Sequence, residues 1–157
     1  MKELAEKNIL VTGASSGIGA GTAVVLARHG ANVVINHRNS AEKAERIAGR
    51  IRETGSKALV IQADMTDRQQ VNHMVDQILH EWGSIDALVS NVGHAYYKRI
   101  EALQPEDWYL SVDVNLTSQI HCLQAVLPHM IARSQGSLIL LSSISAQRGS
   151  PSGDITY

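Results

Sequence analysis

The residues with the clearest chemical potential form a glycine-rich turn between a short apolar run and a helical pattern. Gly13, Gly17 and Gly19 follow directly on the apolar residues 9–11. Glycine lets a backbone turn sharply and lets a ligand approach where a Cβ would block it. The free amides and the positive dipole end of the following helix suit a pyrophosphate. The turn therefore predicts a phosphate site, and a glycine-rich turn without a ligand is the alternative that this stretch alone leaves open.

Other polar residues with catalytic or binding potential directly follow later apolar runs; they are Asp64, Asn91, Ser142 and Ser143. Taken singly, each has an ordinary interpretation, because aspartate, asparagine and serine are common turn and loop residues. Asn115 lies inside a long helical pattern and Tyr157 is the last residue, and either could be a surface residue. These residues can form a functional site only if the fold brings them together.

The elements that must position these residues alternate along the chain. Apolar runs at 9–11, 32–36, 57–63, 85–90 and 137–141 predict strands, with helical patterns between them. Because the runs are apolar throughout, they favour a parallel sheet with helices on both faces. The predicted fold class is α/β, a doubly wound Rossmann-like sheet. Its ligand should lie at the carboxyl ends of the strands, beside the topological switch point.

Local signals place the helix ends. Ser40 is a candidate N-cap, and Asp67 with Gln70 resembles a capping arrangement. Pro105 suits the first turn of a long helical region that runs to about residue 132, with an interruption near Asn115. The inward face of this region is assigned to Leu116, Ile120, Leu123 and Leu127.

Composition narrows the class of protein. With 157 residues, a net charge of -1 and a pI near 6.6, the chain suits one domain and gives no electrostatic case for nucleic acid or an anionic membrane. The single cysteine, Cys122, fits a reducing compartment. No apolar run approaches the roughly 20 residues of a membrane span. The histidines show no metal-ligand spacing. We therefore expect a cytoplasmic protein without a metal site.

Taken in order, these residues resemble the motifs of the short-chain dehydrogenase/reductase family, and most closely its 3-oxoacyl-acyl-carrier-protein reductase branch. Thr12-Gly13-x-x-x-Gly17-x-Gly19 looks like the family's fingerprint. Asn91-Val92-Gly93 is similar to its Asn-Asn-Ala-Gly segment, with Ser90 and Val92 as departures. The resemblance implies Asn115, Ser143 and Tyr157 as catalytic residues. The expected cofactor contacts are Gly13, Ser15, Ser16, Gly17, Ile18, Gly19, Arg38, Asp64, Met65, Asn91 and Gly93.

The end of the second predicted strand indicates which nicotinamide cofactor is used. An NAD site usually carries an acid there to bond the adenosine ribose, whereas this chain has His37 and Arg38. An arginine can pair with a 2′-phosphate in a bidentate manner. We therefore expect NADP(H) rather than NAD(H). The alternative is that Arg38 is a solvated residue leading into the next helix.

The mechanism that the resemblance implies is hydride transfer between the nicotinamide and a carbonyl or alcohol carbon. Tyr157 would give its phenolic proton to the carbonyl oxygen, and Ser143 would hydrogen-bond that oxygen. In this family a lysine four residues after the tyrosine lowers the tyrosine pKa, and Asn115 would position a water leading toward it. The spacing from Ser143 to Tyr157 is one residue longer than usual, which leaves Ser142 or Ser145 possible as the working serine.

The sequence ends at Tyr157, before the position of that lysine. We therefore expect residues 1–157 to form a single, C-terminally incomplete dinucleotide-binding domain, lacking the last strands and helices and inactive alone as a reductase. The expected function of the complete form is NADP(H)-dependent reduction of a small carbonyl substrate, with a 3-oxoacyl type favoured, by a homo-oligomer (dimer or tetramer). The alternative is a non-catalytic NADP(H)-binding regulatory or sensor module.

Overall fold

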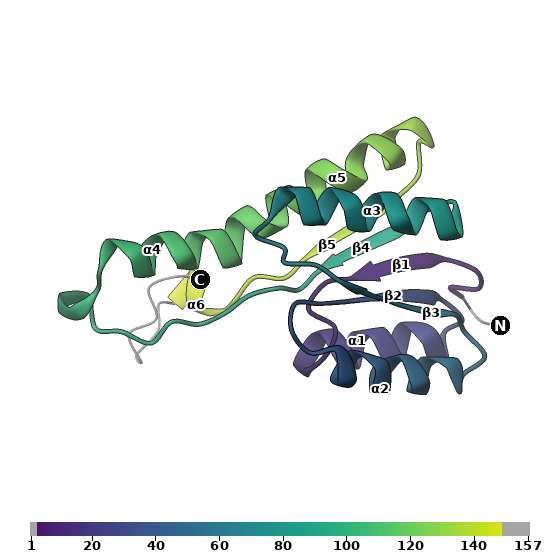
Figure 1. Ribbon diagram of the computed structural model, residues 1–157, viewed down its shortest axis with the longest axis horizontal. Helices are drawn as coiled ribbons and strands as arrows, with labels where there is room; N and C mark the ends of the chain where they lie inside the picture. Colours follow the sequence, from purple (N-terminus) through teal and green to yellow (C-terminus); the bar gives the residue numbers. More distant parts are fainter. Residues whose placement is uncertain (1–2, 149–157) are drawn as a thin grey trace.

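The five apolar runs form one parallel sheet, as predicted. The computed structural model describes residues 3–148, apart from the side chain of Ala146 (Figure 1). The strand order is β3-β2-β1-β4-β5, and every neighbouring pair runs parallel. The strands are β1 (Asn8–Val11), β2 (Asn32–His37), β3 (Ala58–Gln62), β4 (Ala87–Ser90) and β5 (Ser137–Leu140). The predicted doubly wound α/β fold is confirmed.

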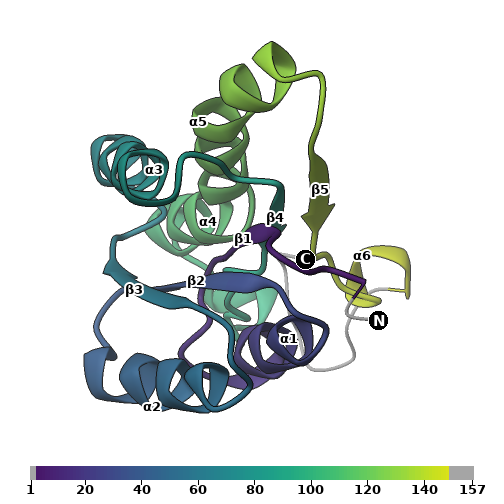
Figure 2. The same cartoon turned by 90° about the vertical axis from the view of Figure 1, so that its right-hand side faces the viewer.

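Helices cover both faces of the sheet. They are α1 (Gly17–Arg28), α2 (Ala41–Arg52), α3 (Arg68–Trp82), α4 (Pro105–Val112), α5 (Ser118–Ala132) and α6 (Ser145–Arg148), with a 3-10 turn η1 (Ile100–Ala102) and a π-helical turn η2 (Asp113–Thr117). Helices α1 and α2 pack on one face, and α3 and α5 on the other (Figures 1 and 2). Each side has its own apolar core, because the strands bury side chains on both faces.

Helix ends follow the sequence signals in part. Asp67 accepts hydrogen bonds from the amides of Gln69 and Gln70 at 2.8 and 3.2 Å, so it caps α3 as predicted. The hydrogen bond from the Gln70 side chain is the main reason that the pKa of Asp67 is lowered. Pro105 is the first residue of α4, also as predicted. Ser40 stands at the N-cap of α2 but makes no side-chain capping bond, so that detail was wrong.

The long helical region from Pro105 to Ala132 is interrupted at Asn115, as predicted, and the interruption is the π-helical turn η2. Its inward face was predicted correctly only in part, since Leu123 packs against the core that includes α3. Leu116 and Ile120 are exposed, whereas the buried stripe repeats every four residues through Val114, Ser118, Cys122, Val126 and Met130. Two of these buried side chains, Ser118 and Cys122, are small.

The edge strand β5 carries the segment that leads to the predicted serines. Leu138, Ile139 and Leu140 on it are between 37% and 46% exposed, so this edge is apolar and uncovered within residues 3–148. Among residues 3–148, no helix is both long and apolar enough to span a lipid bilayer. Strands β1 and β4 are neighbours although three helices and two strands separate them in sequence. Their carboxyl ends therefore mark the switch point at which a doubly wound sheet binds its ligand.

Candidate active site

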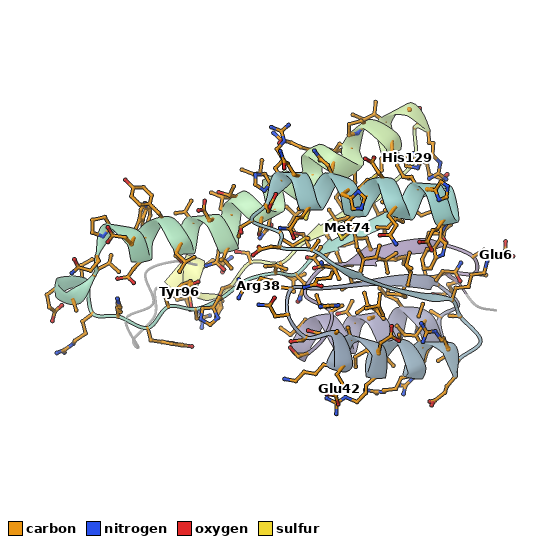
Figure 3. All side chains as sticks on the ribbon, in the orientation of Figure 1. Glu6, Arg38, Glu42, Met74, Tyr96 and His129 are labelled. Carbon is orange, nitrogen blue, oxygen red and sulfur yellow. The ribbon has the colours of Figure 1, made fainter. Side chains whose placement is uncertain are left out.

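A cleft of about 1120 Å³ opens at the carboxyl ends of the strands. Figure 3 shows Arg38 at this end of the sheet and Tyr96 farther along, beneath α4. Most of the site residues predicted from the sequence line the cleft: Gly13, Ser15, Ser16, Gly17, Ile18, Arg38, Asp64, Met65, Asn91, Gly93 and Asn115. Gly19 and Ser143 lie beside the cleft without lining it, and Tyr157 is outside the described residues. The fold thus gathers segments that are far apart in sequence.

The glycine-rich turn has the geometry of a phosphate cradle. Gly13 and Gly17 adopt φ values of 61° and 56°, which L-residues with side chains rarely take. A Cβ on Gly19 would lie 2.6 Å from Asn91 Nδ2 and 2.7 Å from the Gly13 carbonyl oxygen, so only glycine fits there. The first turn of α1 contains no acidic residue. Because first-turn amides have no intrahelical acceptor, this turn fits an anionic pyrophosphate.

Thr12 and Asn91 hold the turn against the end of β4. The Asn91 amide donates to Thr12 Oγ1 at 2.9 Å, and Asn91 Nδ2 donates to the Thr12 carbonyl at 3.0 Å. A weaker bond at 3.4 Å runs from the same Nδ2 to the Gly13 carbonyl. The Asn91 side chain therefore fixes the backbone of the glycine turn relative to the end of β4.

Asn36 is a site residue that the sequence reasoning missed. Its side chain is buried at the end of β2, where Oδ1 accepts from the Gly13 amide at 3.1 Å and Nδ2 donates to the Ala63 carbonyl at 3.0 Å. Asn36 thus ties the glycine turn to the end of β3. An asparagine directly after the apolar run 33–35 was the signal, because a buried amide must find partners.

The opposite wall of the cleft pairs Arg38 with Asp64. Arg38 Nη1 lies 3.8 Å from Asp64 Oδ2, and the Arg38 side chain is 61% exposed, so the pair is loose and the cation is accessible to a ligand. Asp64 Oδ1 also accepts from the Thr66 amide and hydroxyl at 2.9 and 2.8 Å. Asp64 therefore starts a turn, its ordinary interpretation, while also lining the cleft.

His37 adds no positive charge beside Arg38 at neutral pH. The His37 side chain is buried, and its Nδ1 has no hydrogen-bond partner within the described part of the chain. Burial lowers the pKa of His37, and the nearby Glu45 carboxylate opposes that shift more weakly. The imidazole is therefore mainly neutral at neutral pH.

Asn115 fastens the π-helical turn to the loop that follows β4. Its Oδ1 accepts from the His94 amide at 2.7 Å, and its Nδ2 donates to the His94 carbonyl at 2.9 Å. The same Nδ2 donates to Ser111 Oγ at 3.2 Å. The Asn115 side chain thus pairs with both backbone polar groups of His94. This pairing fixes the loop that forms the wall of the cleft between β4 and α4.

The far end of the cleft is partly aromatic. The His94 and Tyr96 rings meet edge to face, with centroids 4.6 Å apart. Trp108 from α4 lines the same end of the cleft. These rings and the neighbouring Val112 form a wall that suits the apolar part of a small organic ligand.

The serine segment follows β5. Ser142 lines the cleft, whereas Ser143 is half-buried and its Oγ accepts from the Ser145 amide at 3.2 Å. A serine hydroxyl that accepts one bond keeps its proton free to donate another. Ser143 can therefore act as a hydrogen-bond donor in the direction that its amide partner leaves open.

Comparison with known proteins places this site in a family context. The sequence model for short chain dehydrogenase matches residues 7–155. The chain is 36% identical over 151 residues to the 3-oxoacyl-[acyl-carrier-protein] reductase FabG of Staphylococcus aureus. The aligned region covers 96% of this chain and 61% of that enzyme. The chain therefore spans about 61% of the length of this curated relative.

Solved structures share the fold. A short-chain type dehydrogenase/reductase from Mycobacterium marinum superposes with a TM-score of 0.89 at 33% identity, over 93% of this chain and 59% of that one. An NADH-dependent reductase, A1-R', complexed with NAD, superposes with a TM-score of 0.91 at 28% identity, over 98% of this chain and 66% of that one. Similar proteins thus include one that was solved with a nicotinamide cofactor bound.

Proposed function

Because the chain belongs to the short-chain dehydrogenase family, we propose that its complete form reduces a carbonyl group to an alcohol with NADP(H). One observation carries the proposal: a single cleft joins the glycine-rich turn, Arg38, Asn115 and the segment that begins at Ser142. These are the phosphate, cofactor-selecting and catalytic parts that such a reaction needs in one place.

Each part of the chain has a distinct role in this proposal. The amides around Gly17 bind the pyrophosphate, and Arg38 pairs with a 2′-phosphate. The nicotinamide, when bound, supplies the hydride. Ser143 donates a hydrogen bond to the substrate carbonyl oxygen and holds it in place. Tyr157, which lies outside the described residues, delivers the proton to that oxygen, as the family resemblance implies.

We propose a 3-oxoacyl-type substrate, because the Staphylococcus aureus relative carries that activity in its name. The aromatic wall of His94, Tyr96 and Trp108 suits the apolar part of such a substrate. The direct test is to follow NADPH oxidation by the complete form with acetoacetyl and simple ketone substrates, using Tyr157→Phe as the control. Binding of NADPH without turnover would instead indicate a non-catalytic module.

The Arg38→Asp exchange is expected to reverse the cofactor preference from NADPH to NADH. It removes the partner of the 2′-phosphate and puts a second carboxylate beside Asp64, which repels the phosphate. Loss of a charge-assisted contact corresponds to about 1.5–3 kcal/mol, or roughly 10- to 100-fold in affinity. Titration of the chain with both cofactors measures the effect.

The matched control is Arg46→Asp, which makes the same charge change on the exposed surface of α2. It should leave the ratio of the two affinities unchanged. A parent chain that already prefers NADH, or an Arg38→Asp variant with an unaltered ratio, contradicts the assignment of Arg38.

The complete form is proposed to be a homo-oligomer that uses the long helical region from Pro105 to Ala132. Large apolar side chains are exposed along it, among them Tyr109, Leu116 and Ile120. We expect Ile120→Glu to shift light scattering from oligomer to monomer at micromolar concentration, because it buries a charge in the contact. Val25→Glu, at a position on α1 that is also exposed, should leave the oligomer intact. A parent that is a stable monomer contradicts this proposal.

A further inference from the structure

One side-chain amide joins two parts of the site that the sequence keeps far apart. Gln119 lies on the first turn of α5 and lines the cleft. Its Nε2 donates to the carbonyl of Asn115 at 3.0 Å and to the carbonyl of Leu141 at 3.1 Å. Leu141 directly precedes Ser142, so the amide bridges the π-helical turn and the start of the serine segment.

The orientation of this amide follows from its neighbours. Both partners are carbonyl oxygens, which only accept, so the nitrogen rather than the oxygen of the side chain must face them. The nitrogen has two hydrogens, and the two carbonyls take one each. Gln119 is half-buried. If the side-chain oxygen stood in place of Nε2, it would face the carbonyl oxygens of Asn115 and Leu141, and none of the three acceptors would have a donor there.

The π-helical turn explains why a side chain is needed here. The Ser118 amide donates to the Asp113 carbonyl, five residues back, rather than to Val114. The Val114 carbonyl is instead taken by Ser118 Oγ at 2.6 Å, from four residues ahead. Gln119 stands in the same relation to Asn115, so side chains complete the hydrogen bonding of consecutive carbonyls in the turn.

A continuous chain of hydrogen bonds results. The side chain of Asn115 holds the loop after β4 through His94, and its carbonyl is held by Gln119. Gln119 in turn holds the carbonyl of Leu141, and the amide of Leu141 donates to the Ser90 carbonyl at the end of β4. The Gln119 amide thus links the backbone at Asn115 directly to the backbone that leads to the serine segment.

We propose that Gln119 is a positioning residue that sets the serine segment at its working distance from Asn115. The inference rests on the proposed reductase function, because that function makes the distance matter. Gln119 itself touches no reacting atom in this assignment. It acts through the carbonyl of Leu141, and so through the backbone that leads to Ser143.

Nuclear magnetic resonance of the 157-residue chain tests the bridge without any activity. The side-chain NH₂ signals of Gln119 should exchange with solvent about 3- to 10-fold more slowly than those of exposed Gln124 on the same helix, as one hydrogen bond of ordinary strength implies. Gln119→Met should shift the backbone amide signals of Ser142 and Ser143, whereas Gln124→Met should shift only signals in α5. Equal exchange of the two side chains, or shifts confined to α5, would overturn the bridge.

Kinetics of the complete form test the role in the reaction. Gln119→Met should lower kcat about 10-fold and leave the KM for NADPH unchanged, since a small misplacement of a catalytic group costs rate rather than cofactor binding. Gln119→Glu should lower kcat by the same factor at neutral pH, because a carboxylate cannot donate to the two carbonyls. Its kcat should rise relative to the parent as the pH falls, because a protonated carboxyl regains one donor. An unchanged kcat, or no recovery of Gln119→Glu at low pH, would overturn the positioning role. A parent without turnover refutes the proposed function, while the resonance experiment still decides the bridge.

Discussion

Replacing Ser143 with alanine is expected to lower kcat of the complete form by a factor of about 10²–10³. Ser143 Oγ accepts from the Ser145 amide, which leaves its own proton available for the substrate carbonyl oxygen. That oxygen gains negative charge as the hydride arrives, so the hydrogen bond strengthens in the transition state. The KM for NADPH should stay the same, because no cofactor contact is removed.

The matched controls are Ser142→Ala and Ser145→Ala, which remove the hydroxyls on either side. Ser142 lines the cleft and Ser145 contributes its backbone amide to Ser143, so neither change removes the proposed donor. Steady-state rates with a saturating ketone compare the three variants. A larger loss in Ser142→Ala than in Ser143→Ala would move the catalytic role to Ser142.

The Gly19→Ala exchange is expected to weaken NADPH binding by at least about 10-fold and to lower stability by about 1–3 kcal/mol. The new methyl would lie 2.6 Å from Asn91 Nδ2 and 2.7 Å from the Gly13 carbonyl oxygen. The carbonyl belongs to the backbone of the phosphate turn and cannot swing aside as a flexible side chain would. The turn itself must therefore shift, which displaces the amides that bind the ligand.

Gly21→Ala provides the control within the same helix. A Cβ at Gly21 meets nothing within 4 Å, so it should stabilise α1 by roughly 0.5–1 kcal/mol and leave binding unchanged. Titration with NADPH and thermal unfolding of the chain measure both variants. A Gly19→Ala chain that binds as tightly as the parent would show that the turn tolerates the methyl and that its shape is not set by this contact.

Long-range contacts explain the residues that sequence reasoning missed. Asn36 lies near the end of a strand and Gln119 lies on a helix. Their partners, Gly13 and Leu141, lie 23 and 22 residues away. Nothing in the local pattern names those partners, because they become neighbours only when parallel strands align.

The face of the long helical region shows the same limit in a different way. The leucine at 116 and the isoleucine at 120 follow a regular helical spacing, and that spacing favoured them as the buried face. The π-helical turn changes the phase of the helix at residues 113–117, and the next two residues on the buried face are Ser118 and Cys122. Composition alone favours burying leucine, whereas close packing against a sheet favours small residues.

The sequence by itself determined the α/β class, the order of the strands along the chain, the glycine turn, the cap at Asp67 and the break at Asn115. These depend on local periodicity, backbone freedom and side-chain capping, all of which act within a few residues. Tertiary structure alone decided that Gln119 bridges the π-helical turn to β5, that Asn36 ties three strand ends together, and that Arg38 faces Asp64. Those contacts exist because a parallel sheet brings the carboxyl ends of distant strands to one edge.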